Sequence, residues 1–124
     1  MLYKLPEIDI LSPAFQASAI GLNACSCSPD VVRGVRITCA CLRHDLDYDL
    51  VNTWRKSREI SFFRWMVLKR DADDRLLDGI IQLGDQAGVD LSDVALVYFG
   101  AVRRFNWLYR LGGWIAGLFS GSKN

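Results

Sequence analysis

Apolar residues recur at helical spacing in three long stretches of the chain. In the first stretch, over 38–56, an apolar residue stands at every fourth position, namely Leu42, Leu46, Leu50 and Trp54. The second stretch, over 61–87, repeats the period with Ala72, Leu76, Leu77, Ile80, Ile81 and Leu83. The third runs from about residue 92 to about residue 109. Because residues three or four apart share one face of a helix, the pattern predicts three helices.

Capping and turn-forming residues separate these stretches. Thr38 is expected to be the N-cap of the first helix, and Gly84 or Gly88 is expected to end the second. Asp90 and Ser92 are cap candidates for the third helix.

The remaining segments have the composition of loops. Residues 21–37 are rich in Gly, Asn, Ser, Pro and Asp, with room for a short hairpin over 31–37. Residues 1–20 are irregular, apart from a short helical turn within LSPAFQASAIG. No segment alternates apolar and polar residues as a half-buried strand does. The predicted class is therefore mostly α.

Length, composition and charge indicate how many domains the chain forms and which class of partner is not expected. With 124 residues, 51% of them hydrophobic, it can build one core of ordinary size. It contains no linker-like or repeated segment, so we interpret 1–124 as a single domain. A formal net charge of +1 gives no electrostatic footprint for nucleic acid, and no nucleic-acid partner is expected.

The first residues, MLYKLPEIDILSPAF, do not form a signal peptide. Lys4, Pro6, Glu7 and Asp9 interrupt any apolar core that such a peptide needs. Two locations stay open: use inside a cell, or export by another route, such as delivery within a virus particle.

The stretch CACLRHDLDYDL carries the chemistry of the first predicted helix. His44, the only histidine of the chain, and Tyr48 are four residues apart and share a face. Asp45 lies about 100° round the helix and is free to bind a hard cation, which prefers oxygen ligands. Histidine is the usual general base near neutral pH, although a lone histidine on a helix is more often a surface or core residue. Asp47 and Asp49 are interpreted as a solvated face.

A general base needs an orienting acceptor on its second ring nitrogen. The segment RDADDRLLDG of the next predicted helix supplies candidate carboxylates at Asp71, Asp73, Asp74 and Asp78.

The four cysteines form two C-x-C pairs, Cys25 with Cys27 and Cys39 with Cys41. Zinc sites usually use C-x-x-C, and two helical residues two apart point about 200° away from one another. A disulfide needs only one member of each pair and would tie the 21–37 loop to the start of the helix. Four reduced, buried thiols are the alternative.

Together these motifs resemble the prokaryotic secreted phospholipases A2. That family couples an Asp-x-Cys-(Ser/Thr)-x-x-Pro-Asp loop to an Ala-Cys-x-Arg-His-Asp-x-x-Tyr helix, and parvovirus capsid lipases and some phage-encoded proteins are similar around the same motif. The match is carried by Asn23, Ala24, Cys25, Ser26, Pro29 and Asp30 in the loop and by Ala40, Cys41, Arg43, His44, Asp45 and Tyr48 in the helix. DADDRLL and YFGAVRRF resemble the family's later helices, so the resemblance covers about 22–106.

The resemblance implies a fold and a reaction. The fold is a small helical domain with two main antiparallel helices, a calcium loop and a third helix. The reaction is calcium-dependent hydrolysis of the sn-2 ester of glycerophospholipids at a membrane surface. His44 would be the base that activates water, and Asp73, or failing that Asp74, would orient it. Tyr48 and Tyr98 would donate hydrogen bonds around this pair.

The resemblance also implies a metal site and a disulfide. Asp45 would bind Ca²⁺ together with loop groups at Asn23 and Ala24. Cys25 and Cys41 would form the disulfide that fixes the loop, and Cys27 and Cys39 could pair beside it.

One position departs from the family pattern. The loop carboxylate of the family is replaced by the amide of Asn23, which brings no charge and predicts weaker calcium binding. The alternative is therefore a weakly active or inactive phospholipase A2-like protein, with a structural or membrane-docking role such as that of a phage particle component.

The end of the chain, VALVYFGAVRRFNWLYRLGGWIAGLFSG, is apolar, aromatic and cationic. Arginines divide it into runs too short to cross a bilayer, which takes about 20 apolar residues. Residues 94–105 are expected to join the core. For the tail over 107–124, contact with a membrane interface and docking onto another virion or protein subunit are equally open.

Overall fold

The computed structural model describes residues 3–22, 25 and 30–104 of the chain. Within these ranges it contains the helices α1 (Pro13–Ser18), α2 (Thr38–Lys56) and α3 (Phe62–Gln86), a helix over 92–104, and the strands β1 (Val31–Val32) and β2 (Val35–Arg36). The mostly α class is confirmed, and so are the short helical turn and the short hairpin. The predicted end of the last helix, at about residue 109, lies outside the described residues.

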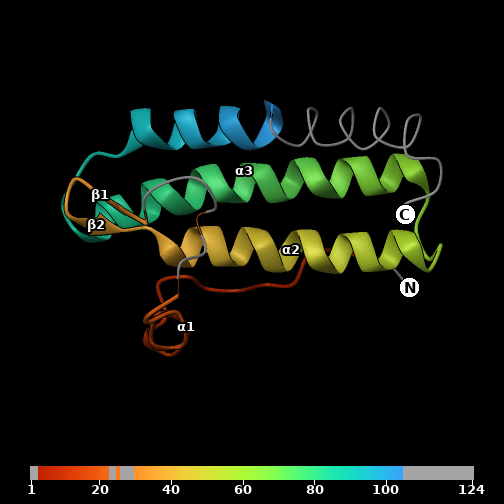
Figure 1. The fold of residues 1–124 in the computed structure, drawn as a ribbon, viewed down its shortest axis with the longest axis horizontal. Coiled ribbons are helices and arrows are strands. Elements are labelled where there is room, and N and C mark those ends of the chain that lie inside the picture. The colour runs from red at the N-terminus through yellow and green to blue at the C-terminus, as the bar shows by residue number, and fades with distance from the viewer. Residues whose placement is uncertain (1–2, 23–24, 26–29, 105–124) are drawn as a thin grey trace, which may run out of the picture.

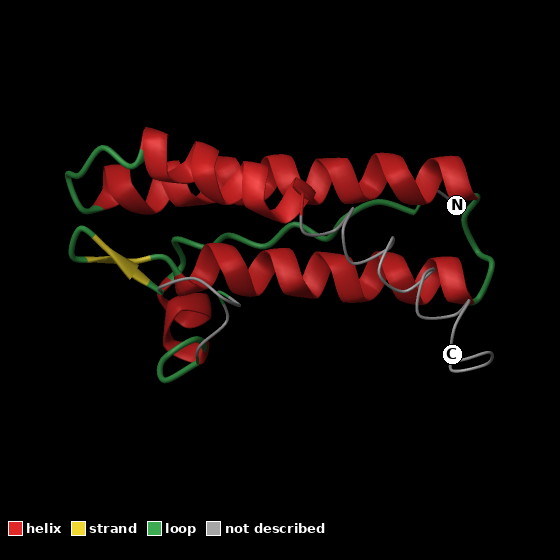
Figure 2. Cartoon of the chain, turned by 45° about the horizontal axis from the view of Figure 1, so that its top comes forward, coloured by secondary structure: helices red, strands yellow, loops and turns green. Residues whose placement is uncertain are grey.

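The long helices lie side by side. α2 and α3 run antiparallel, and the helix over 92–104 returns along α3 (Figures 1 and 2). The hairpin of β1 and β2 precedes α2, and α1 lies near the same end of the molecule (Figure 1). α2 and α3 therefore pack along one line of contact, which we call the seam.

Arginine side chains hold the extended N-terminal segment against this helix pair. Arg43 of α2 donates from Nη1 to the Ile8 carbonyl oxygen at 2.9 Å, and Arg75 of α3 donates from Nη2 to that of Pro6 at 2.8 Å. A segment without a partner strand leaves its carbonyl groups without hydrogen bonds. These guanidinium groups satisfy two of them and fix the segment over the seam.

Two groups of buried apolar side chains form the core. The larger group joins the hairpin, α2, α3 and the following helix, and includes Ile10, Ile37, Ala40, Leu76, Ile80, Leu83, Leu91 and Ala95. The smaller group lies toward the other end of the seam and contains Leu5, Val51, Ile60, Leu68 and Ala72. Together they bury apolar surface along the length of both long helices, which is the main stabilising contribution expected in such a domain.

The leucine stripe of α2 is not its buried face. Leu46 is 42% exposed, and Leu50 is only half-buried. The face turned toward α3 carries Ala40, His44, Asp47 and Val51 at helical spacing. The prediction of a solvated face is right for Asp49 and wrong for Asp47, whose side chain is completely buried. Of the two polar side chains on this face, His44 contacts Asp73 of α3, and Asp47 lies 3.7 Å from Arg75 of α3.

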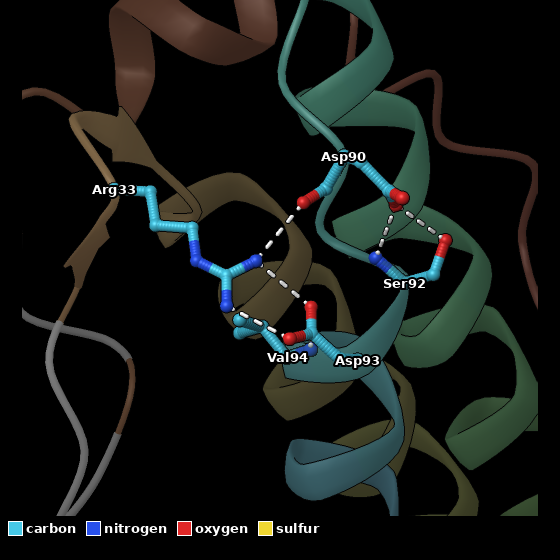
Figure 3. Close-up of polar contacts among 5 residues, drawn as sticks. All are labelled: Arg33, Asp90, Ser92, Asp93 and Val94. Atoms are coloured by element: carbon cyan, nitrogen blue, oxygen red, sulfur yellow. Dashed lines mark hydrogen bonds and ion pairs between the residues drawn. The ribbon is translucent and has the colours of Figure 1, made fainter.

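A two-residue turn connects β1 to β2. Arg33 and Gly34 both have positive φ, 52° and 80°, as the tight hairpin turn with right-handed strand twist requires. The Arg33 guanidinium reaches the start of the helix over 92–104, donating to both carboxylate oxygens of Asp93 at 2.9 and 2.8 Å and to the Asp90 carbonyl oxygen at 3.1 Å (Figure 3). These contacts are exposed, and exposed ion pairs contribute little stability. Their main effect is therefore to orient the hairpin.

Capping follows the sequence prediction in part. The Asp90 carboxylate accepts hydrogen bonds from the backbone N–H and the hydroxyl of Ser92, at 3.0 and 2.7 Å, and so satisfies a free N–H at the helix start (Figure 3). Thr38, by contrast, is the first residue of α2 and not its N-cap, which is Ile37.

The last described helix, over 92–104, is only partly core. Ala95 is fully buried and Tyr98 packs against the larger core group, whereas Leu96 and Val97 are exposed. None of the helices in the described part of the chain is long and apolar enough to span a membrane. The predictions for the tail over 107–124 lie outside the described residues.

α3 ends in a glycine turn, and Gly88 is the residue that ends it. Gly88 has a φ of 74°, and the N–H of Val89 donates to the Gly84 carbonyl oxygen at 2.8 Å. The returning chain passes so close to α3 that a Cβ added at Gly84 would lie 2.6 Å from the Val89 carbonyl oxygen.

Gly84→Ala is expected to lower the free energy of unfolding by about 1–3 kcal/mol, because the clash with backbone outweighs the better helix propensity of alanine. Gly100→Ala is the matched control, since no described atom lies within 4 Å of a Cβ there. That variant should gain about 0.5–1 kcal/mol. Urea denaturation followed by circular dichroism measures both, and changes of the same sign would contradict the close approach.

Candidate active site

His44 of α2 and Asp73 of α3 meet across the seam. His44 Nε2 lies 2.8 Å from Asp73 Oδ1, and both side chains are buried. A hydrogen on Nε2 donates to the carboxylate, which leaves Nδ1 as the ring nitrogen able to accept a proton. No described residue forms a hydrogen bond with Nδ1. The arrangement is that of an imidazole base oriented by a carboxylate.

Tyr48 completes the contacts of α2 with this carboxylate. Its hydroxyl donates to Asp73 Oδ1 at 2.6 Å, and its ring packs on His44 with centroids 4.3 Å apart. Burial raises the pKa of Tyr48, and the hydrogen bond to Asp73 and the charge of that carboxylate raise it further. The hydroxyl therefore stays protonated and remains a donor.

A cation also contacts the Tyr48 ring. Lys69 is buried, and its Nζ lies 5.0 Å from the centroid of Tyr48 and 4.4 Å from that of Trp65. Trp65 in turn donates from Nε1 to Asn52 Oδ1 at 2.9 Å. Cation–π attraction between these groups holds the tyrosine ring in place beside His44.

Arg103, from the helix over 92–104, binds the second oxygen of Asp73. Its Nε donates to Asp73 Oδ2 at 2.9 Å, and its Nη2 lies 3.6 Å from Asp74 Oδ1. Asp74 is largely exposed and pairs with this arginine rather than with His44. Of the two predicted partners of His44, the structure places Asp73 at the ring.

Arg103 was not among the residues predicted for the site. The sequence did contain one signal for it: Arg103 follows Phe99 by four residues within YFGAVRRF, which places both side chains on one face of a helix. In the structure the guanidinium stacks on the Phe99 ring at 4.6 Å. The sequence alone does not reveal which face of that helix turns toward α3. Tyr98 packs against the larger core group, and its role beside His44 stays a prediction.

Asp45 is exposed beside the His44–Asp73 pair. Desolvation by neighbouring atoms raises its pKa; the charge of His44 opposes this, and that of Asp49 adds to it. No donor of the described residues binds its carboxylate. Its position and oxygen chemistry suit a hard cation, for which Asn23 and Ala24, outside the described residues, were the other predicted ligands. Within the described ranges no three His, Cys, Asp or Glu residues are grouped to hold a metal.

A disulfide and a carboxylate anchor the loop to α2. Cys25 and Cys41 form the disulfide that the family resemblance implied. Asp30 accepts from the Thr38 hydroxyl at 2.7 Å and from the backbone N–H of Cys25 at 3.3 Å. The loop is therefore bound to the first turn of the helix that carries His44 and Asp45.

The predicted pairing of Cys27 with Cys39 is wrong. Cys39 is a free thiol buried in the larger core group, and its burial raises its pKa. On a helix it points about 200° away from Cys41, and therefore away from the anchored loop. A four-thiolate zinc site is also excluded, because Cys25 and Cys41 are bonded to one another.

Asp47 is a buried charge without a hydrogen-bond partner among the described residues. Neither of its oxygens accepts a hydrogen bond, and the nearest cation is Arg75, whose Nε lies 3.7 Å from Oδ2. Burial raises the pKa of Asp47, against the opposing charges of Arg75, Arg43 and His44. The ionised form of the Asp47 side chain is therefore less stable in the folded protein than in water.

The sequence matches no protein-family model, and no curated protein and no solved structure matches the chain. The geometry of the site and its motifs are therefore what indicates a function.

Asp47→Asn tests the energetic cost of burying the Asp47 carboxylate. Because the folded-state pKa is raised, the folded protein binds more protons than the unfolded chain above the ordinary carboxyl pKa, and its stability falls as pH rises. The stability of Asp47→Asn relative to the unsubstituted protein should therefore increase from about pH 4 to about pH 7. Denaturant titrations across this range measure it. Asp49→Asn, which removes an exposed carboxylate of the same helix, is the control, and an equal pH dependence in both would contradict the prediction.

Proposed function

We propose that the protein is a calcium-dependent hydrolase of the sn-2 ester of glycerophospholipids, similar to the secreted phospholipases A2. The observation that supports this best is the 2.8 Å contact between His44 Nε2 and Asp73 Oδ1. These residues are 29 positions apart, and the motif resemblance singled out both of them. An imidazole oriented in this way suits proton abstraction from water.

In the proposed reaction, a water held at His44 Nδ1 gives up a proton to the ring as its oxygen attacks the sn-2 carbonyl carbon. The Asp73 carboxylate stabilises the imidazolium that forms, because its Oδ1 accepts the Nε2–H. When the carbon–oxygen ester bond breaks, His44 returns the proton to the leaving alkoxide. The products are a fatty acid and a lysophospholipid.

Asp45 is the proposed calcium ligand from α2, with the Asn23 side chain and the Ala24 carbonyl from the loop. Bound calcium would supply positive charge for the oxyanion and for the substrate phosphate. Two observations support the assignment: the Asp45 carboxylate has no donor among the described residues, and the Cys25–Cys41 disulfide ties the loop to the same helix.

Exposed apolar residues beside the loop support a lipid partner. Ile20 and Leu22 precede the loop segment 23–30, Val31 follows it, and all three are exposed. Exposed apolar side chains near one site are a common feature of surfaces that contact lipid.

The second candidate is a structural or membrane-docking protein with the same fold, for example a component of a phage particle. Asn23 favours it, because a neutral amide in place of the loop carboxylate weakens a calcium site. The two candidates differ in one measurable property, the release of fatty acid.

His44→Ala tests the proposed base. With phospholipid vesicles and millimolar Ca²⁺, the unsubstituted protein should release fatty acid and lysophospholipid in equal amounts, and the variant should be slower by about 10³-fold or more. Asp49→Asn should retain full activity, since this carboxylate is exposed on α2. A folded protein that releases no fatty acid, or a variant as active as the parent, would favour the structural role.

Asp45→Asn and Asn23→Asp test the metal site in opposite directions. The first should abolish the response of fatty-acid release to Ca²⁺, because the only carboxylate of the proposed ligand set is lost. The second should lower the Ca²⁺ concentration for half-maximal release by about tenfold, because it adds a charged ligand. Calcium titrations of the vesicle assay measure both effects. Unchanged half-maximal concentrations in both variants would argue against these ligands.

A further inference from the structure

The Asp73 carboxylate is bound on both oxygens by groups from two other helices. Oδ1 accepts from Tyr48 at 2.6 Å and faces His44 Nε2 at 2.8 Å, both from α2. Oδ2 accepts from Arg103 Nε at 2.9 Å, from the helix over 92–104. Asp73 itself is only 3% exposed.

A buried carboxylate needs compensation for its charge. When His44 is neutral and ready to accept a proton, neither it nor the Tyr48 hydroxyl carries a positive charge. Of the described residues, Arg103 is the cation that forms a hydrogen bond with Asp73. Arg103 is therefore placed to balance the charge of Asp73 beside the proposed base.

Arg103 is itself held in place. Its guanidinium stacks on Phe99, one helical turn earlier, with 4.6 Å between Cζ and the ring centroid. Its Nη2 also lies 3.6 Å from Asp74 Oδ1. A planar guanidinium fixed on both sides restrains the carboxylate that it binds, whereas a carboxylate bonded through one oxygen rotates more freely about its last torsion.

We propose that Arg103 is a positioning residue for the His44–Asp73 pair: it balances the charge of the buried Asp73 carboxylate and holds it in the orientation that directs Oδ1 at His44 Nε2. This inference rests on the proposed function for its catalytic consequence, while the geometric part stands without it. The proposal gives the helix over 92–104 a role at the site beyond packing.

The simpler alternative is that Arg103 only links its helix to α3 through acidic side chains. In that case its replacement would weaken folding and leave the His44 ring unchanged. Arg103→Gln keeps a donor and removes the charge, and Arg103→Lys keeps the charge without the planar fork. Arg104→Gln is the matched control, because this neighbouring arginine is exposed and its loss changes the net charge equally.

The first measurement does not depend on activity. His44 is the only histidine, so its ring N–H signal in nitrogen-15 labelled protein is unambiguous. At one fixed pH, exchange of the Nε2 hydrogen with water should be at least about tenfold faster in Arg103→Gln than in Arg104→Gln, because the acceptor is less fixed. Arg103→Lys should lie between the two. Equal exchange rates in all three proteins would overturn the proposal, as would an Nε2–H signal missing from the unsubstituted protein.

The second measurement is the steady-state rate on phospholipid vesicles. Arg103→Gln should lower kcat by about tenfold and change KM by less than about twofold, since Arg103 acts on the dyad and not on lipid binding. Arg103→Lys should recover part of kcat, and Arg104→Gln should retain it. A kcat equal to that of Arg104→Gln would overturn the catalytic part.

Should the unsubstituted protein release no fatty acid, the proposed function fails, and the exchange measurement still decides the placement of Arg103. Should Arg103→Gln not fold, as judged by circular dichroism, the comparison of Arg103→Lys with Arg104→Gln decides both parts.

Discussion

The buried carboxylate of Asp73 constrains the arrangement of all three long helices. A charged group with only 3% exposure is tolerated in a protein interior when its oxygens are bonded and its charge is balanced. α2 supplies the Tyr48 hydroxyl and the His44 ring, and the helix over 92–104 supplies Arg103. Because each donor projects from a regular helix, a small rotation of any one helix would break a contact. Apolar packing holds the helices together, and Asp73 selects their register.

A second polar layer in the same seam has a different energetic balance. Arg43 and Arg75 donate hydrogen bonds to backbone carbonyl oxygens of the N-terminal segment. These acceptors are neutral, so no second charge has to be buried with either guanidinium. Asp47 lies near them without a hydrogen bond of its own. Apolar residues of similar volume often stabilise a fold as well as or better than a buried ion pair. The seam is therefore more polar than stability alone requires, and the proposed activity accounts for the part around His44 but not for Asp47.

The sequence predicted the helices and the central pair well, for identifiable reasons. Helical periodicity and glycine gave the bounds of α2 and α3 within a residue, because these signals are local. The pairing of His44 with Asp73 followed from a motif resemblance, and helix geometry correctly separated Cys39 from Cys41. The burial of Asp47 and the contact of Arg103 were missed. Both depend on which face of a helix meets a neighbour, and the leucine stripe of α2 indicated the wrong face.

That error follows from how this helix is used. A helix that buries only apolar residues shows its inner face in its sequence, because hydrophobicity decides which side turns inward. α2 instead buries Ala40, His44, Asp47 and Val51, and leaves Leu46 partly exposed. Satisfying His44 and Asp73 in one seam requires that face to turn inward. Leu46 is 42% exposed, and the gain from burying the rest of it, about 1 kcal/mol, is too small to reverse this orientation. A conflict between apolar pattern and observed burial is expected where function constrains a fold, and here it coincides with the residues assigned to the site.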